Sequence, residues 1–161
     1  MSMIGEYVRL APGDLEKALS DPEWAWELVD ELLEADEGDP RLFDVDKAWH
    51  GLALVLDRAG LPSGIIFGDG AVPGADDWGY GPPSSLGVAR VGELAAALDE
   101  ISPIETVRAV PGSVLAAEGI YPKELWEEPT WAEYLIGHLE GLKAFFREAT
   151  DSGMGMLVWL D

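Results

Sequence analysis

A long amphipathic segment followed directly by an apolar stretch occupies the C-terminal part of the chain. Large apolar side chains recur there at i, i+4, i+8 and i+11, the period of a helix that buries one face: Trp131, Leu135, Leu139, Leu142, Phe145, Phe146 and Ala149. Thr130 is expected to cap this helix and Gly153 to end it, and residues 154–160 are predicted to form a buried strand. Because both elements need apolar cover, the fold must combine helix and sheet in one core.

A second strand is predicted at the opposite end of the chain. Residues 3–10 contain the apolar Ile4, Tyr7, Val8 and Leu10 without a helical repeat, and Pro12 and Gly13 end the segment. The 161 residues amount to about one domain. We therefore predict an α+β fold, a helix-dominated single domain over residues 1–161. Its small, mainly antiparallel sheet would include the N- and C-terminal strands and be covered by helices on one side.

The segment between the two ends is predicted to be mostly helical. The expected helices cover residues 14–20, 22–37, 46–60 and 88–101, with short ones after Pro103 and from Pro111 to Gly119. Asp21 before Pro22 and Ser102 before Pro103 are the expected start signals of two of them. Residues 61–87 are rich in glycine and proline, which predicts a long irregular region containing one short strand at 65–67. Loops of this length are often functional.

The net charge of −21 narrows the range of partners. Ten basic residues face 31 acidic ones, so the chain repels nucleic acid and anionic membrane surfaces, and neither is expected as a partner. A basic protein is the partner that such a charge would attract. The chain has no cysteine, which excludes disulfides and thiolate chemistry, and no apolar run approaches the roughly 18 residues of a membrane span. We expect a soluble, cytoplasmic protein. The sequence leaves its oligomeric state open and favours a monomer slightly.

The helix predicted at 22–37 concentrates this negative charge on one face. Residues 14–46 contain 13 acidic residues against Lys17 and Arg41. Glu27, Asp30 and Glu34 fall on the polar half of the helical wheel, and Trp26 falls at its boundary. Such a face could present carboxylates to a basic partner, as immunity-type and inhibitor proteins do. The alternative is that it only keeps the protein soluble.

Three segments in the same order carry a family resemblance. They are MSMIGEY at the N-terminus, LFDVDKAWHGL at residues 42–52, and GIYP at residues 119–122. Together they resemble the YfbM-like family, bacterial proteins grouped as a domain of unknown function. The resemblance implies a single α+β domain and supplies no activity, substrate or cofactor.

The strongest catalytic candidates lie in the second of these segments. Asp46 and His50 are i,i+4 neighbours on one helix face, and a carboxylate beside an imidazole can make it a general base. Asp44 and Lys47 complete the group, with Lys47 interpreted as a local charge partner. The alternative is that Asp46 caps the helix and His50 is simply solvated. A small enzyme or ligand-binding protein that uses Asp46, His50 and the glycine-rich loop 64–81 is therefore the competing hypothesis.

The aromatic residues of the loop are candidates for binding. Trp78 and Tyr80 follow Asp76 and Asp77, and aromatic rings beside carboxylates can hold cations or basic side chains. Their alternative role is to anchor the loop to the core. Tyr121, in the I-Y-P tripeptide, is the third aromatic candidate, and a cleft joining His50, Tyr80 and Tyr121 would favour the ligand-binding hypothesis.

No metal or cofactor is expected. Two histidines without a zinc-binding spacing, and no EF-hand pattern, give no metal signature. No basic residue lies between Arg58 and Arg90, and the loop lacks the glycine order of a phosphate-binding turn. His138 falls within the apolar stripe of the last helix and is expected to be a packed imidazole. The sequence thus favours a non-enzymatic binding or interaction module.

Overall fold

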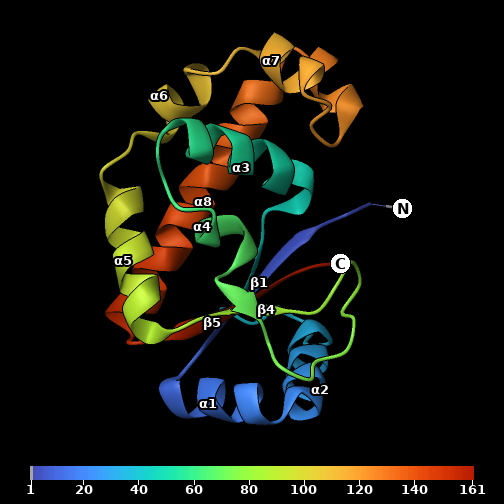
Figure 1. Ribbon diagram of the computed structural model, residues 1–161, viewed down its shortest axis with the longest axis vertical. Helices are drawn as coiled ribbons and strands as arrows, with labels where there is room; N and C mark the ends of the chain where they lie inside the picture. The colour runs from blue at the N-terminus through green and yellow to red at the C-terminus, as the bar shows by residue number, and fades with distance from the viewer. Residues whose placement is uncertain (1) are drawn as a thin grey trace.

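The two ends of the chain form the centre of the sheet. The computed structural model describes residues 2–161, and its strands are β1 (Gly5–Leu10), β2 (Leu42–Asp44), β3 (Gly70–Ala71), β4 (Ser84–Leu86) and β5 (Gly155–Leu160). Their order in the sheet is β2-β1-β5-β4-β3, with every neighbouring pair antiparallel. β1 and β5 pair over their full length, from Gly5↔Leu160 to Leu10↔Gly155 (Figure 1). The predicted pairing of the terminal strands is confirmed.

Helices make up most of the rest of the chain. The α-helices are α1 (Pro12–Ser20), α2 (Pro22–Leu33), α3 (Trp49–Arg58), α4 (Gly64–Phe67), α5 (Val88–Asp99), α6 (Pro103–Arg108), α7 (Gly112–Ala117) and α8 (Trp131–Asp151), and short 3₁₀ helices cover Asp46–Ala48 and Lys123–Glu127. The proposed start signals hold at Asp21 and Ser102, whose side chains accept backbone N–H bonds from Trp24 and Glu105. Thr130 precedes α8 but makes no side-chain cap.

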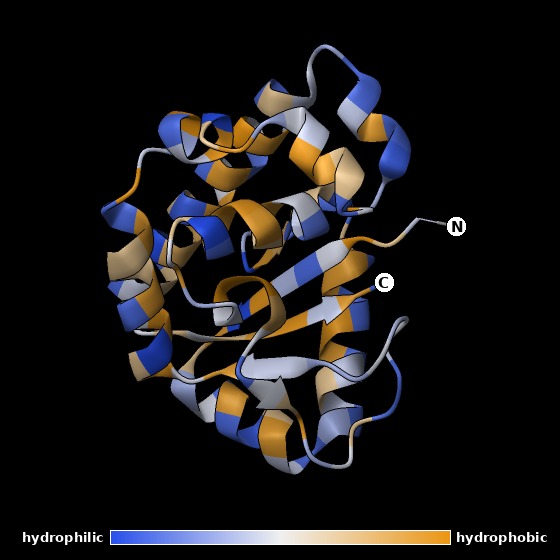
Figure 2. Cartoon of the chain, turned by 45° about the horizontal axis from the view of Figure 1, so that its top comes forward, coloured by the Kyte–Doolittle hydropathy of each residue, from blue (hydrophilic) through white to orange (hydrophobic). Residues whose placement is uncertain are grey.

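Helices cover both faces of the sheet, which corrects the expectation of one-sided cover. Tyr7 and Val158 point into a large core formed with α3, α5 and α8, whereas Val8, Leu157 and Trp159 point into a smaller core between the sheet and α1 and α2. In Figure 1, α1 and α2 lie below the sheet and the other helices above it. Figure 2 shows alternating hydrophobic and hydrophilic segments along the helices, as expected where one side of each is buried. β5 is thus buried on both faces, and its run of apolar residues contributes side chains to both cores.

Two predictions are wrong: the strand at residues 65–67 and the C-terminal end of the helix predicted at 22–37. Residues 65–67 form part of the helical turn α4, because Ile65 and Ile66 are buried there and the Tyr7 hydroxyl donates to the Ile65 carbonyl at 2.7 Å. A three-residue apolar run cannot by itself distinguish a buried strand from a buried turn. α2 ends at Leu33, one turn before the predicted end, and a turn leads to Gly38 at φ 71°. No helix within residues 2–161 combines the length and apolarity needed to cross a membrane.

Two helical glycines give opposite predictions for replacement by alanine. A Cβ at Gly51 in α3 would lie 2.6 Å from the buried Trp126 ring, whereas a Cβ at Gly137 in α8 would meet nothing within 4 Å. We expect Gly51→Ala to lower the free energy of unfolding by about 1–3 kcal/mol through overpacking. Gly137→Ala should raise it by about 0.5–1 kcal/mol because alanine favours the helix. Urea denaturation measures both, and a Gly51→Ala variant as stable as Gly137→Ala would contradict the packing described here.

Candidate functional site

The segment from Asp44 to Lys47 is joined to α8 by hydrogen bonds to Tyr134. An Asp44 carboxylate oxygen accepts the Asp46 backbone N–H at 2.9 Å, and Asp46 has a left-handed backbone with φ 48°. The Tyr134 hydroxyl donates to Asp46 Oδ2 at 2.7 Å and accepts the Lys47 backbone N–H at 3.2 Å. Asp46 is therefore the first residue of the 3₁₀ helix rather than its N-cap, a position that Val45 holds. No ion pair involving the Lys47 ammonium is present within residues 2–161.

His50 makes a different set of contacts. Its Nδ1 accepts the Tyr121 backbone N–H at 2.9 Å, and its ring stacks on Trp49 with centroids 4.9 Å apart. Burial lowers the pKa of His50, so the imidazole is neutral near pH 7 with its hydrogen on Nε2. The nitrogen lone pair that a general base would use is occupied by the Tyr121 amide. Asp46 and His50 thus have separate partners, Tyr134 and Tyr121, and the described geometry does not pair them as a catalytic dyad.

Tyr121 and Tyr80 lie in separate environments. The Tyr121 hydroxyl accepts the Met3 N–H at 3.0 Å, and the Trp49 indole donates to the Met3 carbonyl, so both aromatic residues anchor the N-terminal segment. Tyr80 lies beside Phe67 at a cavity of about 240 Å³, which neither His50 nor Tyr121 lines. The structure therefore does not bring His50, Tyr80 and Tyr121 together around this cavity.

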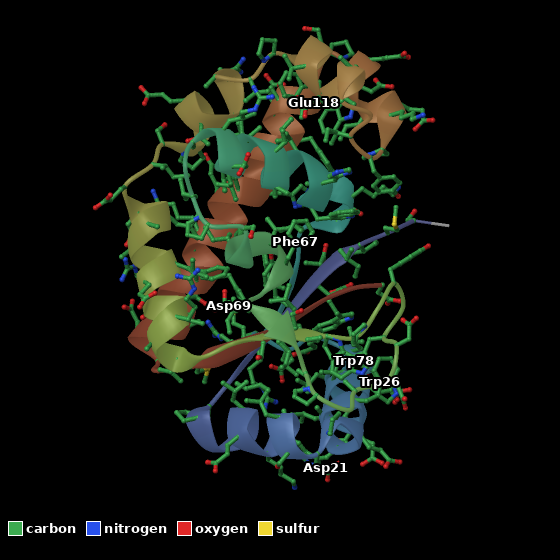
Figure 3. All side chains as sticks on the ribbon, viewed as in Figure 1. Asp21, Trp26, Phe67, Asp69, Trp78 and Glu118 are labelled. Carbon is green, nitrogen blue, oxygen red and sulfur yellow. The ribbon has the colours of Figure 1, made fainter. Side chains whose placement is uncertain are left out.

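Carboxylates and tryptophans gather where α2 begins. We call this the α2 cleft: a hollow of about 700 Å³ between the first turn of α2 and the segment 74–78. The N-cap residue Asp21 lines it together with Glu23 and Trp26 of α2, and Asp76, Asp77 and Trp78 line it from the loop. Figure 3 shows Trp26 and Trp78 side by side at this end of the molecule. The sequence suggested both tryptophans separately, but nothing in it indicated that they meet.

The acidic face of α2 is free of the rest of the fold. Glu27, Asp30 and Glu34 are all exposed, as the helical wheel predicted, while Ala25, Val29 and Leu32 on the opposite side are buried. Two large apolar residues are exposed on the same helix, Trp26 at 42% and Leu33 at 50%. The helical wheel placed Trp26 at the boundary of the polar half, and the structure shows that Leu33 is exposed as well.

A buried carboxylate that sequence analysis missed lies at the sheet. Glu6 in β1 is half-buried opposite Asp44 of β2 and Trp159 of β5, close to Asp161. Burial raises the pKa of the Glu6 carboxyl to about 7, and the charges of Asp44 and Asp161 add to the rise. No lysine or arginine of residues 2–161 forms an ion pair with it. Only the pairing of distant strands brings these three carboxylates together.

The described residues offer no metal centre. Across residues 2–161, no group of three or more histidine and acidic side chains is arranged to hold a metal ion. His138 is half-buried, and its ring packs edge-on against Tyr134 at 4.6 Å.

A helix-dominated α+β fold with a two-sided antiparallel sheet is the class that these features define. Residues 1–159 match the model of a family described as a domain of unknown function, DUF1877, and the chain belongs to this family. Among solved structures it is similar to YfbM, a protein of unknown function from Escherichia coli, with a TM-score of 0.70 and 18% identity over 98% of this chain and 99% of that one. The resemblance seen in the sequence is thereby confirmed, and it extends to the fold. None of the curated proteins compared with the sequence matches it.

Glu6 predicts a pH dependence of stability. Its pKa is higher in the folded than in the unfolded chain, so its contribution to stability is complete below the unfolded value of 4.5 and is lost as the pH rises through about 7. Glu6→Gln removes the carboxylate charge. The free energy of unfolding of this variant, relative to that of the wild type, should therefore rise by about 1–2 kcal/mol from pH 5 to pH 8. This figure is smaller than the full pKa shift implies because solvent screens the partly exposed charge.

Urea denaturation at the two pH values measures this difference. Glu124→Gln, an exposed carboxylate with no ion pair or side-chain hydrogen bond recorded within residues 2–161, is the matched control and should show no such change. A Glu6→Gln variant whose relative stability is the same at pH 5 and pH 8 would show that Glu6 ionises as an ordinary carboxylate.

Proposed function

We propose that this chain is a non-enzymatic interaction module that binds a basic protein partner through the exposed face of α2. The observation that carries the proposal is the composition of that face, where Glu27, Asp30 and Glu34 are exposed together with Trp26 and Leu33. Carboxylates alone would be consistent with solubility. A binding face differs in that it also exposes large apolar side chains, as Trp26 and Leu33 are exposed here.

The spacing on α2 supports a single contact surface. Trp26, Asp30 and Leu33 stand at i, i+4 and i+7, so they follow one stripe of the helix, with the two apolar residues about 10 Å apart along its axis. Glu27 and Glu34 lie beside this stripe, on the side away from the buried Val29. A large aromatic side chain next to polar groups is a common arrangement at an interface hot spot with its rim.

The distribution of positive charge supports a basic partner. All six arginines form ion pairs, and their acidic partners lie outside α2: Asp39, Asp69, Glu93, Asp99, Glu118, Glu133, Glu148 and Asp151. Within residues 2–161, no ion pair therefore compensates the charge of the α2 carboxylates. A face of this kind accelerates encounters with positively charged surfaces.

The class of partner follows from this chemistry. A basic surface such as the active site of a toxin or the nucleic-acid-binding face of another protein would be neutralised by the α2 carboxylates, which is how immunity-type and inhibitor proteins act. We place this interaction in the bacterial cytoplasm, with one copy of the chain engaging the partner. The separate partners of Asp46 and His50 support binding over the competing catalytic hypothesis.

The proposal predicts a salt-sensitive association that depends on three carboxylates. A partner captured at low salt should bind the wild type with a rate constant that falls about tenfold or more as salt is raised. The triple variant Glu27→Gln, Asp30→Asn, Glu34→Gln should lose most of the low-salt rate, because the steering charge is gone. Stopped-flow measurements of both proteins against the captured partner determine this.

A second triple variant controls for total charge. Glu100→Gln, Glu124→Gln and Glu140→Gln remove the same charge from exposed positions outside α2 that form no ion pair within residues 2–161. This variant should keep nearly the wild-type rate. Equal losses in the two variants, or a wild-type rate that does not change with salt, would show that the α2 face is ordinary solvated surface.

A further inference from the structure

The α2 cleft has an aromatic wall that is fixed from below. Trp159 of β5 packs edge-on against Trp78 at 5.2 Å, and Trp78 packs edge-on against Trp26 at 5.3 Å. Trp78 and Trp159 are buried, whereas Trp26 is 42% exposed at the mouth of the cleft. The sheet therefore holds in place an indole that is still accessible to a ligand. Edge-to-face contacts of this kind restrict the ring without covering its whole surface.

The charge of the cleft is uncompensated. Asp21, Glu23, Asp76 and Asp77 line it, no lysine or arginine does, and none of these carboxylates forms an ion pair within the described residues 2–161. The backbone N–H groups of Gly81 and Gly79 donate to Asp77 Oδ1 at 2.9 and 2.7 Å, which lowers the pKa of Asp77. The cleft is therefore negatively charged at neutral pH, and its loop wall is held by hydrogen bonds.

A second tryptophan of α2, Trp24, already binds a cation of this chain. The Lys17 ammonium from α1 lies over the Trp24 ring at 4.3 Å from its centroid. Trp26, two residues further along α2, has no cation of this chain over its ring among the described residues. The cavity of about 700 Å³ is within the range of ligand pockets, roughly 300–1,000 Å³.

We propose that the α2 cleft receives an arginine side chain of the basic partner, with its guanidinium against Trp26 and between the carboxylates of Glu23 and Asp76. Arginine fits better than lysine because a planar guanidinium stacks on an aromatic ring and offers paired N–H donors to carboxylates at the same time. This assignment rests on the proposed function, since it names the group of the partner that the chain would recognise. It places the anchor of the interface at the N-terminal end of α2.

A short peptide tests the cleft without the partner. The probe is the tripeptide Gly-Arg-Gly, acetylated and amidated, and its counterpart carries citrulline, which has the same shape without the charge. Titrations at constant ionic strength are followed by the Trp26 indole N–H and the backbone amides of residues 74–78 in nuclear magnetic resonance spectra. The arginine peptide should shift these signals to saturation, and the citrulline peptide should bind about tenfold more weakly.

Matched variants locate the binding. Glu23→Gln with Asp76→Asn should weaken the arginine peptide about tenfold, and because both side chains are exposed their replacement leaves the core intact. Trp26→Leu, which keeps an apolar side chain against Trp78 but removes the indole ring, should weaken it by a similar factor. The control, Glu31→Gln with Glu37→Gln, removes the same charge from exposed positions of α2 and the turn that follows it, outside the cleft, and should leave binding unchanged.

Several results would overturn the assignment. They are equal binding of the arginine and citrulline peptides, shifts centred on Glu27, Asp30 and Glu34 instead of the cleft, or unchanged affinity in the Glu23/Asp76 variant. These outcomes are distinct from a failure of the proposed function, because the cleft variants leave Glu27, Asp30 and Glu34 in place. If the captured partner loses its rate only with that triple variant, the cleft assignment fails and the α2 face remains. If the arginine peptide binds the cleft while the triple variant keeps the wild-type rate, the α2 face fails.

Discussion

The antiparallel pair of β1 and β5 is the interaction on which the rest of the structure depends. It joins the two ends of the chain over six residue pairs, and alternate side chains of these strands enter two separate hydrophobic cores. Tyr7 and Val158 belong to the core under α8, and Val8 and Leu157 to the core above α1 and α2. Without this pair, neither helical layer would have a surface to cover.

This two-sided arrangement determines which helix is available for binding. The larger core uses most of the helices, whereas α1, α2 and the loop segment 72–78 cover the smaller one. α2 buries one side against Trp159 and Trp78, and the residues of its other side, such as Glu27 and Asp30, are exposed. The arginines pair with carboxylates elsewhere in the molecule. The negative charge that no ion pair compensates is therefore concentrated on α2, the helix that also exposes Trp26 and Leu33.

Local patterns predicted much of the fold and little of the site. Helical periodicity identified α8, the Asp21–Pro22 pair identified the start of α2, and apolar runs identified β1 and β5, because each signal lies within a few residues. The second core and the turn α4 were missed because a short apolar run does not show how many layers will cover it. The contacts of Asp46 with Tyr134 and of His50 with Tyr121 span 88 and 71 residues. No spacing rule within one segment could have revealed them, and the same holds for Trp26 and Trp78.

Hydrogen exchange of the native protein tests the central claim, that β1 and β5 hold the two cores together. Amides of the β1–β5 ladder should exchange with the free energy of global unfolding, as the most protected elements of a cooperative unit do. Amides of α1 and α2, which rest on the smaller core, should become unprotected no later than those of β5. The opposite result would be that the amides of β1 and β5 exchange through a low-energy local opening while those of α5 and α8 stay protected. This would contradict the claim, because the larger core would then persist without the strand pair.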